Sequence, residues 1–107
     1  MKKLLGILLA LAMLLGCTAA LADPITLTYA EVNPVPATPE ENAEKGSVVS
    51  DVAWAFKTKL EELSGGEILV DLQGGGVLGS EKDVLANILG GDTSADIVRI
   101  SAFALNQ

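Results

Sequence analysis

The chain has 107 residues, seven of them basic and fourteen acidic, with a formal net charge of −7 and no histidine. The lack of histidine, together with a single cysteine, excludes imidazole catalysis and metal sites built from histidine or thiolate ligands. The acidic balance also argues against a nucleic-acid partner, because a phosphate backbone attracts a basic surface. We expect no cofactor.

The N-terminus has the pattern of a bacterial secretion signal, which we assign to residues 1–22. Met1–Lys3 is positively charged, residues 4–16 carry no polar side chain, and Ala20–Ala22 is an A-x-A cleavage pattern. The 13-residue apolar run is shorter than the roughly 20 residues that cross a membrane. An uncleaved anchor is the alternative, but no positive stop-transfer flank follows. We therefore predict an extracytoplasmic protein.

Cys17 offers a second cleavage pattern inside this signal. Residues 14–17 read Leu-Leu-Gly-Cys, which resembles the lipobox of bacterial lipoproteins. Cleavage before Cys17 would leave it as the site of a lipid anchor, whereas cleavage after Ala22 would discard it. The chain has no second cysteine for an internal disulfide, so we favour lipidation at Cys17 and a protein either periplasmic or anchored on the outer face of a membrane.

The chain after the signal opens with a predicted strand over residues 25–32, where the sequence alternates and is rich in β-formers. Two prolines exclude regular structure from residues 33–37. Glu31 and Asn33 come at the carboxyl end of the strand, the edge at which open α/β sheets bind ligands. Ordinary loop polarity is the competing interpretation of both residues.

A helix is predicted to begin at Thr38. Pro39 suits the first helical position, and Glu41 follows Thr38 at the spacing of a capping box. Gly46 and Ser47 either interrupt this helix or restart it.

A longer helix is predicted up to the Ser-Gly-Gly of residues 64–66. Its apolar stripe has spacings of three and four: Val49, Val52, Ala53, Phe56, Leu60 and Leu63. Trp54 lies roughly opposite the stripe, where it is either a surface contact or partly buried under a neighbouring loop.

The remaining elements complete a β-α-β-α-β order. Residues 67–73 form the second predicted strand, 74–79 a glycine-rich loop, and 95–100 the third strand. Ser80 caps the helix between them, with Asp83 three residues on. This order predicts the α/β class with a mostly parallel sheet and right-handed crossovers.

The glycine-rich loop reads Gly74-x-Gly76-x-x-Gly79, as in a dinucleotide-binding fingerprint. That fingerprint belongs to the first strand of a domain, whereas here a β-α unit precedes it. The acid expected about 20 residues later lies at the end of a strand, but Asp96 begins one. We interpret the loop as a glycine-rich turn at the ligand edge of the sheet.

Arg99, the only arginine, falls in the third predicted strand, where a charge is costly unless it is paired. It either faces a cleft and binds an anion or pairs with an acid such as Asp71 or Glu31. Ser101 is expected on the same face, two residues further.

Three stretches resemble one known family: residues 25–34, residues 55–66 with Glu-Leu-Ser-Gly-Gly, and residues 75–85 with Gly-Val-Leu-Gly-Ser. They are similar to the opening of the solute-binding receptors of TRAP (tripartite ATP-independent periplasmic) transporters. Members of that family have two α/β lobes of the type II periplasmic-binding-protein kind. The resemblance implies that residues 23–107 are a partial N-terminal lobe, and that this lobe alone folds weakly and has no measurable affinity for organic acids. Residues 35–39 and 46–47 do not match the family.

The resemblance also implies a function: capture of a small organic acid and its delivery to membrane permease subunits driven by an ion gradient. Family ligand contacts correspond to six residues here: Glu31, Asn33, Ser80, Glu81, Arg99 and Ser101. The arginine that clamps the ligand carboxylate in the family comes from a later segment, so Arg99 is not given that role. We do not expect an enzyme, since no nucleophile has a visible base. An exported α/β enzyme and a small lipoprotein acting by protein contacts are the alternatives.

Overall fold

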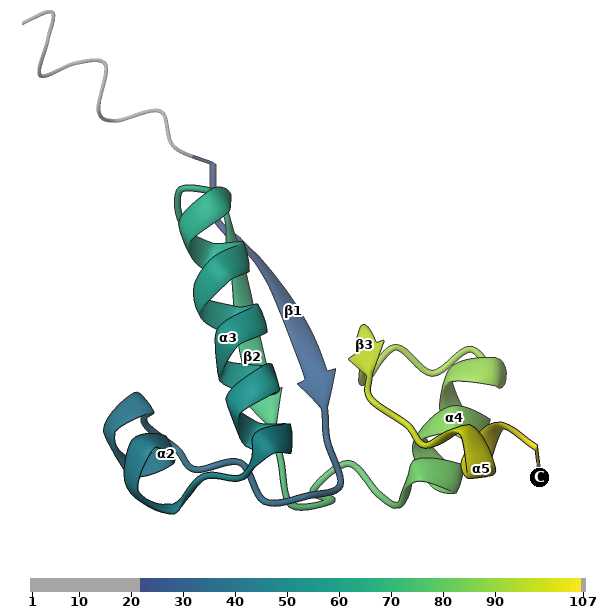
Figure 1. The fold of residues 1–107 in the computed structure, drawn as a ribbon. Helices are drawn as coiled ribbons and strands as arrows, with labels where there is room; N and C mark the ends of the chain where they lie inside the picture. The colour runs from purple at the N-terminus through teal and green to yellow at the C-terminus, as the bar shows by residue number, and fades with distance from the viewer. Residues whose placement is uncertain (1–21, 107) are drawn as a thin grey trace, which may run out of the picture.

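The computed structural model describes residues 22–106, so the predicted signal and Cys17 lie outside the described part. Figure 1 shows its seven elements: β1 (Ile25–Ala30), α2 (Pro39–Lys45), α3 (Val48–Leu63), β2 (Ile68–Gln73), α4 (Glu81–Leu89), β3 (Ile97–Val98) and α5 (Ala102–Leu105). Within residues 22–106, no helix has the length and apolar character needed to cross a membrane.

The three strands form one parallel sheet in the order β2-β1-β3, which confirms the predicted α/β class. The neighbouring residues Tyr29 and Ala30 of β1 point to opposite faces of the sheet. Tyr29 packs with Ala53 of α3. Ala30 packs with Val84 of α4. The two long helices therefore cover opposite faces, as right-handed crossovers require when β2 and β3 flank β1.

The predicted apolar stripe of α3 is only partly correct. Ala53 is fully buried, but Val52 and Leu63 are 54% and 73% exposed. Ala53 and Leu60 of the stripe pack in the core cluster that includes Val70 of β2, and beside them the side chains of Lys57 and Glu61 bind the backbone of Val70. The side of α3 that faces β2 therefore combines part of the apolar stripe with two polar residues.

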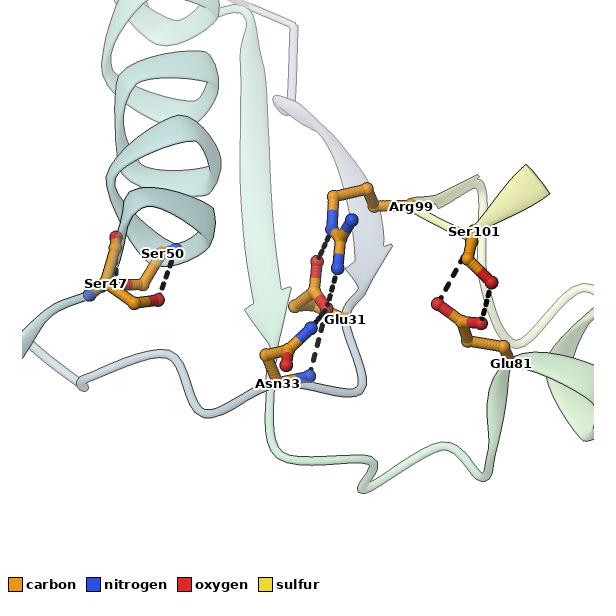
Figure 2. Close-up of polar contacts among 7 residues, drawn as sticks. All are labelled: Glu31, Asn33, Ser47, Ser50, Glu81, Arg99 and Ser101. Carbon is orange, nitrogen blue, oxygen red and sulfur yellow. Dashed lines mark hydrogen bonds and ion pairs between the residues drawn. The ribbon is translucent and has the colours of Figure 1, made fainter. Parts of the chain in front are cut away.

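The helix starts follow the predicted caps. Thr38 accepts a hydrogen bond from the Glu41 amide and begins α2, with Pro39 in its first turn. Gly46 ends α2 and Ser47 caps α3, so this pair both interrupts one helix and starts the next. Ser47 and Ser50 form a reciprocal capping box (Figure 2).

The third strand is shorter than the predicted 95–100. Only residues 97–98 pair with β1 in the ladder. Just before them, the Asp96 amide donates to the Thr28 carbonyl at 2.9 Å, but the Thr28 amide is bound at 2.8 Å by the Asp96 side chain in place of a backbone carbonyl. At the other end, β1 stops at Ala30, whose carbonyl accepts the Arg99 amide at 3.2 Å. Because β1 has ended there, Ile100 has no strand residue beside it to pair with.

Trp54 is partly buried beneath the loop that precedes α2, the second of its two predicted environments. Its indole Nε1 donates to the Pro36 carbonyl at 3.0 Å. The contact fixes the proline-containing loop against α3, and that loop begins at the candidate site.

Candidate functional site

The carboxyl ends of β1 and β3 form a topological switch point. The connection after β1 leads to β2 on one side, and the next connection leads to β3 on the other side. In open α/β sheets, a crevice for ligands forms where neighbouring connections diverge in this way. Glu31 is the first residue after β1, and Arg99 is the first after β3. Two of the predicted site residues therefore meet at this point (Figure 2).

Glu31 is the most buried acidic side chain of the described residues, and the whole residue is 2% exposed. Its carboxylate accepts from Arg99 Nε and, at 3.1 Å, from Arg99 Nη2. Asn33 donates its amide N–H at 2.9 Å and its side-chain Nδ2 at 2.7 Å to Oε1. Burial acts to raise the pKa of Glu31, but hydrogen bonds from Arg99 and Asn33 outweigh it and hold that pKa below its usual value.

Arg99 takes the second of its two predicted roles and pairs with an acid. That acid is Glu31, whereas the Asp71 carboxylate accepts from Gln73 at 2.8 Å. The hydrogen bond to Glu31 raises the pKa of Arg99. The guanidinium is therefore a partner for an internal carboxylate and keeps β3 against β1.

Glu81 and Ser101 form a second polar pair. The Ser101 amide donates to Oε1 of Glu81 at 3.0 Å, and its hydroxyl donates to Oε2 at 2.6 Å (Figure 2). Ser101 also caps α5 by accepting from the Ala104 amide. Glu81 thus joins the first turn of α4 to the start of α5.

Ser80 is exposed and serves as the cap of α4. Its hydroxyl donates to the Asp83 carboxylate at 2.7 Å and accepts from the Asp83 amide at 3.2 Å. The hydrogen bond from the Ser80 hydroxyl to the carboxylate, with a second from the Ser80 amide at 3.2 Å, lowers the pKa of Asp83. The Ser80 side chain therefore hydrogen-bonds to Asp83 and to neither of the two polar pairs, although Ser80 is next to Glu81 in sequence.

The crevice between Glu31 and Arg99 is nearly filled by its own side chains. The cavity there is about 10 Å³, enough for about one water molecule. An open hollow of about 370 Å³ lies beside it, within the size range of small-molecule sites. Its lining residues are Val32, Ser80, Glu81, Lys82, Phe103 and Ala104.

The sequence interpretation named Ser80 and Glu81 of this hollow and missed the other four lining residues, which include Lys82 and Phe103. Lys82 is exposed and forms no ion pair among the described residues. The sequence did contain a signal for Lys82, because a positive charge in the first turn of a helix is unfavourable with respect to the helix dipole. Phe103 is 75% exposed, which only the fold could reveal.

The glycine-rich loop is bound to the loop after β1. The Gly75 amide donates to the Asn33 carbonyl at 2.8 Å, and the Gly76 amide donates to the Glu31 carbonyl at 3.1 Å. Both glycines have a φ of 70°, a conformation that other residues rarely adopt. These two amides are engaged within the protein, and the loop supports the segment that carries Glu31 and Asn33.

The part of the chain from 22 to 106 holds no group of three or more histidine, cysteine or acidic side chains placed to bind a metal ion. No family model matches this sequence, and comparisons with curated proteins and with solved structures likewise give no match.

Proposed function

We propose that this protein is an extracytoplasmic solute-binding receptor that captures a small organic acid for a TRAP-type transporter, tethered to a membrane through Cys17. One observation carries the proposal. Polar residues from three separate segments, after β1, at the start of α4 and after β3, converge at the carboxyl edge of a parallel sheet beside a 370 Å³ hollow. The sequence resemblance to the receptor family supports the same function.

The hollow has the chemistry to bind a carboxylate. Lys82 supplies a positive charge, Ser80 lies beside it, and Phe103 supplies an apolar surface for the body of the ligand. Glu31 and Arg99 neutralise each other in the neighbouring crevice and do not line the hollow, so Lys82 is the one cation among its lining residues. The acids Glu31 and Glu81 are held by hydrogen bonds, which favours binding over acid–base catalysis.

A ligand screen tests the proposal. The full reading frame that contains these residues is purified and heated with dicarboxylates, sugar acids and keto acids, and the melting temperature is recorded. We expect one acid class to raise the melting temperature, because a ligand that binds only the folded state stabilises it. Lys82→Gln should weaken that shift, whereas Lys59→Gln, on the exposed side of α3, should not.

Either of two results would contradict a carboxylate site in this hollow. If no acid shifts the melting temperature, or if Lys82→Gln and Lys59→Gln respond alike, the hollow is not a carboxylate site. Chemical conversion of the acid would instead favour the exported enzyme.

A small lipoprotein that acts by protein contacts is the second candidate, and a different observation favours it. Large apolar side chains are exposed on three helices: Val48, Val52 and Leu63 on α3, Leu89 on α4, and Phe103 and Leu105 on α5. Exposed apolar surface of this kind is typical of protein interaction sites. Cross-linking in intact cells separates the candidates, since a receptor should capture a permease subunit and respond to ligand, whereas a contact lipoprotein should not respond.

A further inference from the structure

The outer edge of β2 has backbone groups that need partners. In the parallel ladder, the Ile25 amide donates to the Glu67 carbonyl at 2.8 Å and the Glu31 amide to the Gln73 carbonyl at 2.9 Å. Every second residue of β2 therefore faces β1, and Ile68, Val70 and Leu72 direct their N–H and C=O groups away from it. Among residues 22–106, no strand lies on that side of β2.

Side chains from α3 occupy the middle of this edge. Lys57 Nζ donates to the Val70 carbonyl at 2.6 Å, and Glu61 Oε1 accepts from the Val70 amide at 3.0 Å. The same two side chains form an ion pair at 2.6 Å, and each is 26% exposed. Both backbone groups of Val70 are therefore bound by one charge pair.

The start of the edge is covered in the same manner. The Ser64 hydroxyl accepts from the Ile68 amide at 3.1 Å and lies 3.2 Å from the Ile68 carbonyl. Lys57, Glu61 and Ser64, which lie along α3 and its C-cap, thus form a continuous edge guard over two of the three outward-facing residues.

The sequence of β2 makes its outer edge prone to pairing with another strand. Ile-Leu-Val-Asp-Leu-Gln is a β-prone segment with one charge and no proline. An uncovered strand of that kind pairs readily with another copy of itself. We propose that Lys57, Glu61 and Ser64 keep the protein from assembling through β2 of a second copy, by engaging the backbone groups that such a copy would bind.

A matched control exists on the same helix. Lys59 and Glu62 form an exposed pair at 3.5 Å, with side chains 63% and 67% exposed. The two pairs, Lys57 with Glu61 and Lys59 with Glu62, both lie on α3, and replacing either pair with two alanines leaves the net charge unchanged. Only the Lys57→Ala/Glu61→Ala variant removes contacts to β2.

The test compares these two double variants in the full chain. Amide hydrogen exchange at Val70 and the oligomeric state by light scattering are measured over a range of protein concentrations. We expect Val70 to exchange about tenfold faster in Lys57→Ala/Glu61→Ala, as the loss of a charge-assisted hydrogen bond predicts, together with concentration-dependent association. Lys59→Ala/Glu62→Ala should behave as the unmodified chain.

Circular dichroism shows whether Lys57→Ala/Glu61→Ala is folded. If it is unfolded, the association of the single variant Lys57→Ala tests the proposal instead, because there Glu61 still binds the Val70 amide and only the Val70 carbonyl is freed. Association of the folded variant supports the proposal. A monomeric variant, or equal association of the guard variant and its control, overturns it.

Discussion

Arg99 and Glu31 are 68 residues apart in the sequence, yet two nitrogens of the guanidinium bind the two oxygens of one buried carboxylate. The pair closes the crevice between β1 and β3, where the sheet has only two paired residues on its β3 side. A short strand gives little backbone pairing, so this ion pair adds to the apolar contacts of Ile97 and Val98 and to the Ser101–Glu81 hydrogen bonds in attaching the chain after residue 96.

Replacing Arg99 alone should therefore be costly. Arg99→Leu leaves the Glu31 carboxylate buried with only Asn33 as a donor. Breaking a buried pair in this way costs about 3 kcal/mol or more, and we expect the lower end because Arg99 is 35% exposed. The free energy of unfolding from urea titration measures the loss.

The double variant Glu31→Leu/Arg99→Leu is the control for this prediction. It removes both charges, so it should be more stable than Arg99→Leu alone. A double variant as unstable as the sum of the two single variants would contradict a direct ion pair, since independent sites add.

Stability should fall in acid, and Glu31 should account for part of the fall. Its pKa in the folded protein is below the ordinary value of 4.5, so the unfolded chain binds the proton more readily. The stabilisation is therefore present above pH 4.5 and is lost as the pH falls through the lower folded pKa. Urea midpoints between about pH 3 and pH 7 measure it.

Glu61 titrates in the same direction, because hydrogen bonds from Lys57 and from the Val70 amide lower its pKa. Glu31→Gln and Glu61→Gln should each flatten part of the acid slope. If Glu31→Gln left the slope unchanged, the pKa of Glu31 would not be lowered on folding.

Local signals predicted the elements well, because their determinants are close in sequence. Thr38 and Ser80 cap helices through residues three positions on, and both caps are confirmed. The choice of Glu31 over Asp71 as partner of Arg99 was not predictable, since it depends on which strand lies beside β3. The order β2-β1-β3 places β1 there, and no local pattern encodes that order.

The candidate site likewise has residues that the sequence predicted and residues that it did not. Glu31 and Asn33 were foreseen at the carboxyl edge of the sheet and Arg99 as the partner of an acid, and Glu31 hydrogen-bonds to both other residues. Lys82 and Phe103 were not, because the hollow exists only once α5 lies beside the first turn of α4.

Gly46 should not tolerate a side chain. Its φ of −67° suits any residue, so the restriction is one of space. A Cβ at this position would lie 2.3 Å from the Asn42 carbonyl oxygen, which is backbone and cannot rotate away. Gly46→Ala should therefore destabilise the protein by about 1–3 kcal/mol, measured by thermal or urea unfolding.

The second variant Asn42→Ala/Gly46→Ala sharpens this prediction. It removes the Asn42 side chain, whose Oδ1 would lie 2.5 Å from the new Cβ, but leaves the carbonyl in place. The double variant should remain destabilised. Full recovery would show that the side chain, and not the backbone, sets the restriction.

The orientation of α3 can be tested with two adjacent residues. Both residues belong to the apolar stripe that the sequence predicts, but Val52 is 54% exposed, whereas Ala53 is fully buried in a cluster with Tyr29 and Val70. Val52→Gln should change the free energy of unfolding by no more than about 0.5 kcal/mol, as is usual for a surface site. Ala53→Gln should cost more than about 3 kcal/mol, because it places both extra volume and an amide in the core. Equal effects, or a larger loss at Val52, would mean that α3 is rotated so that Val52 faces the core, and in that case Lys57 and Glu61 would no longer face the edge of β2.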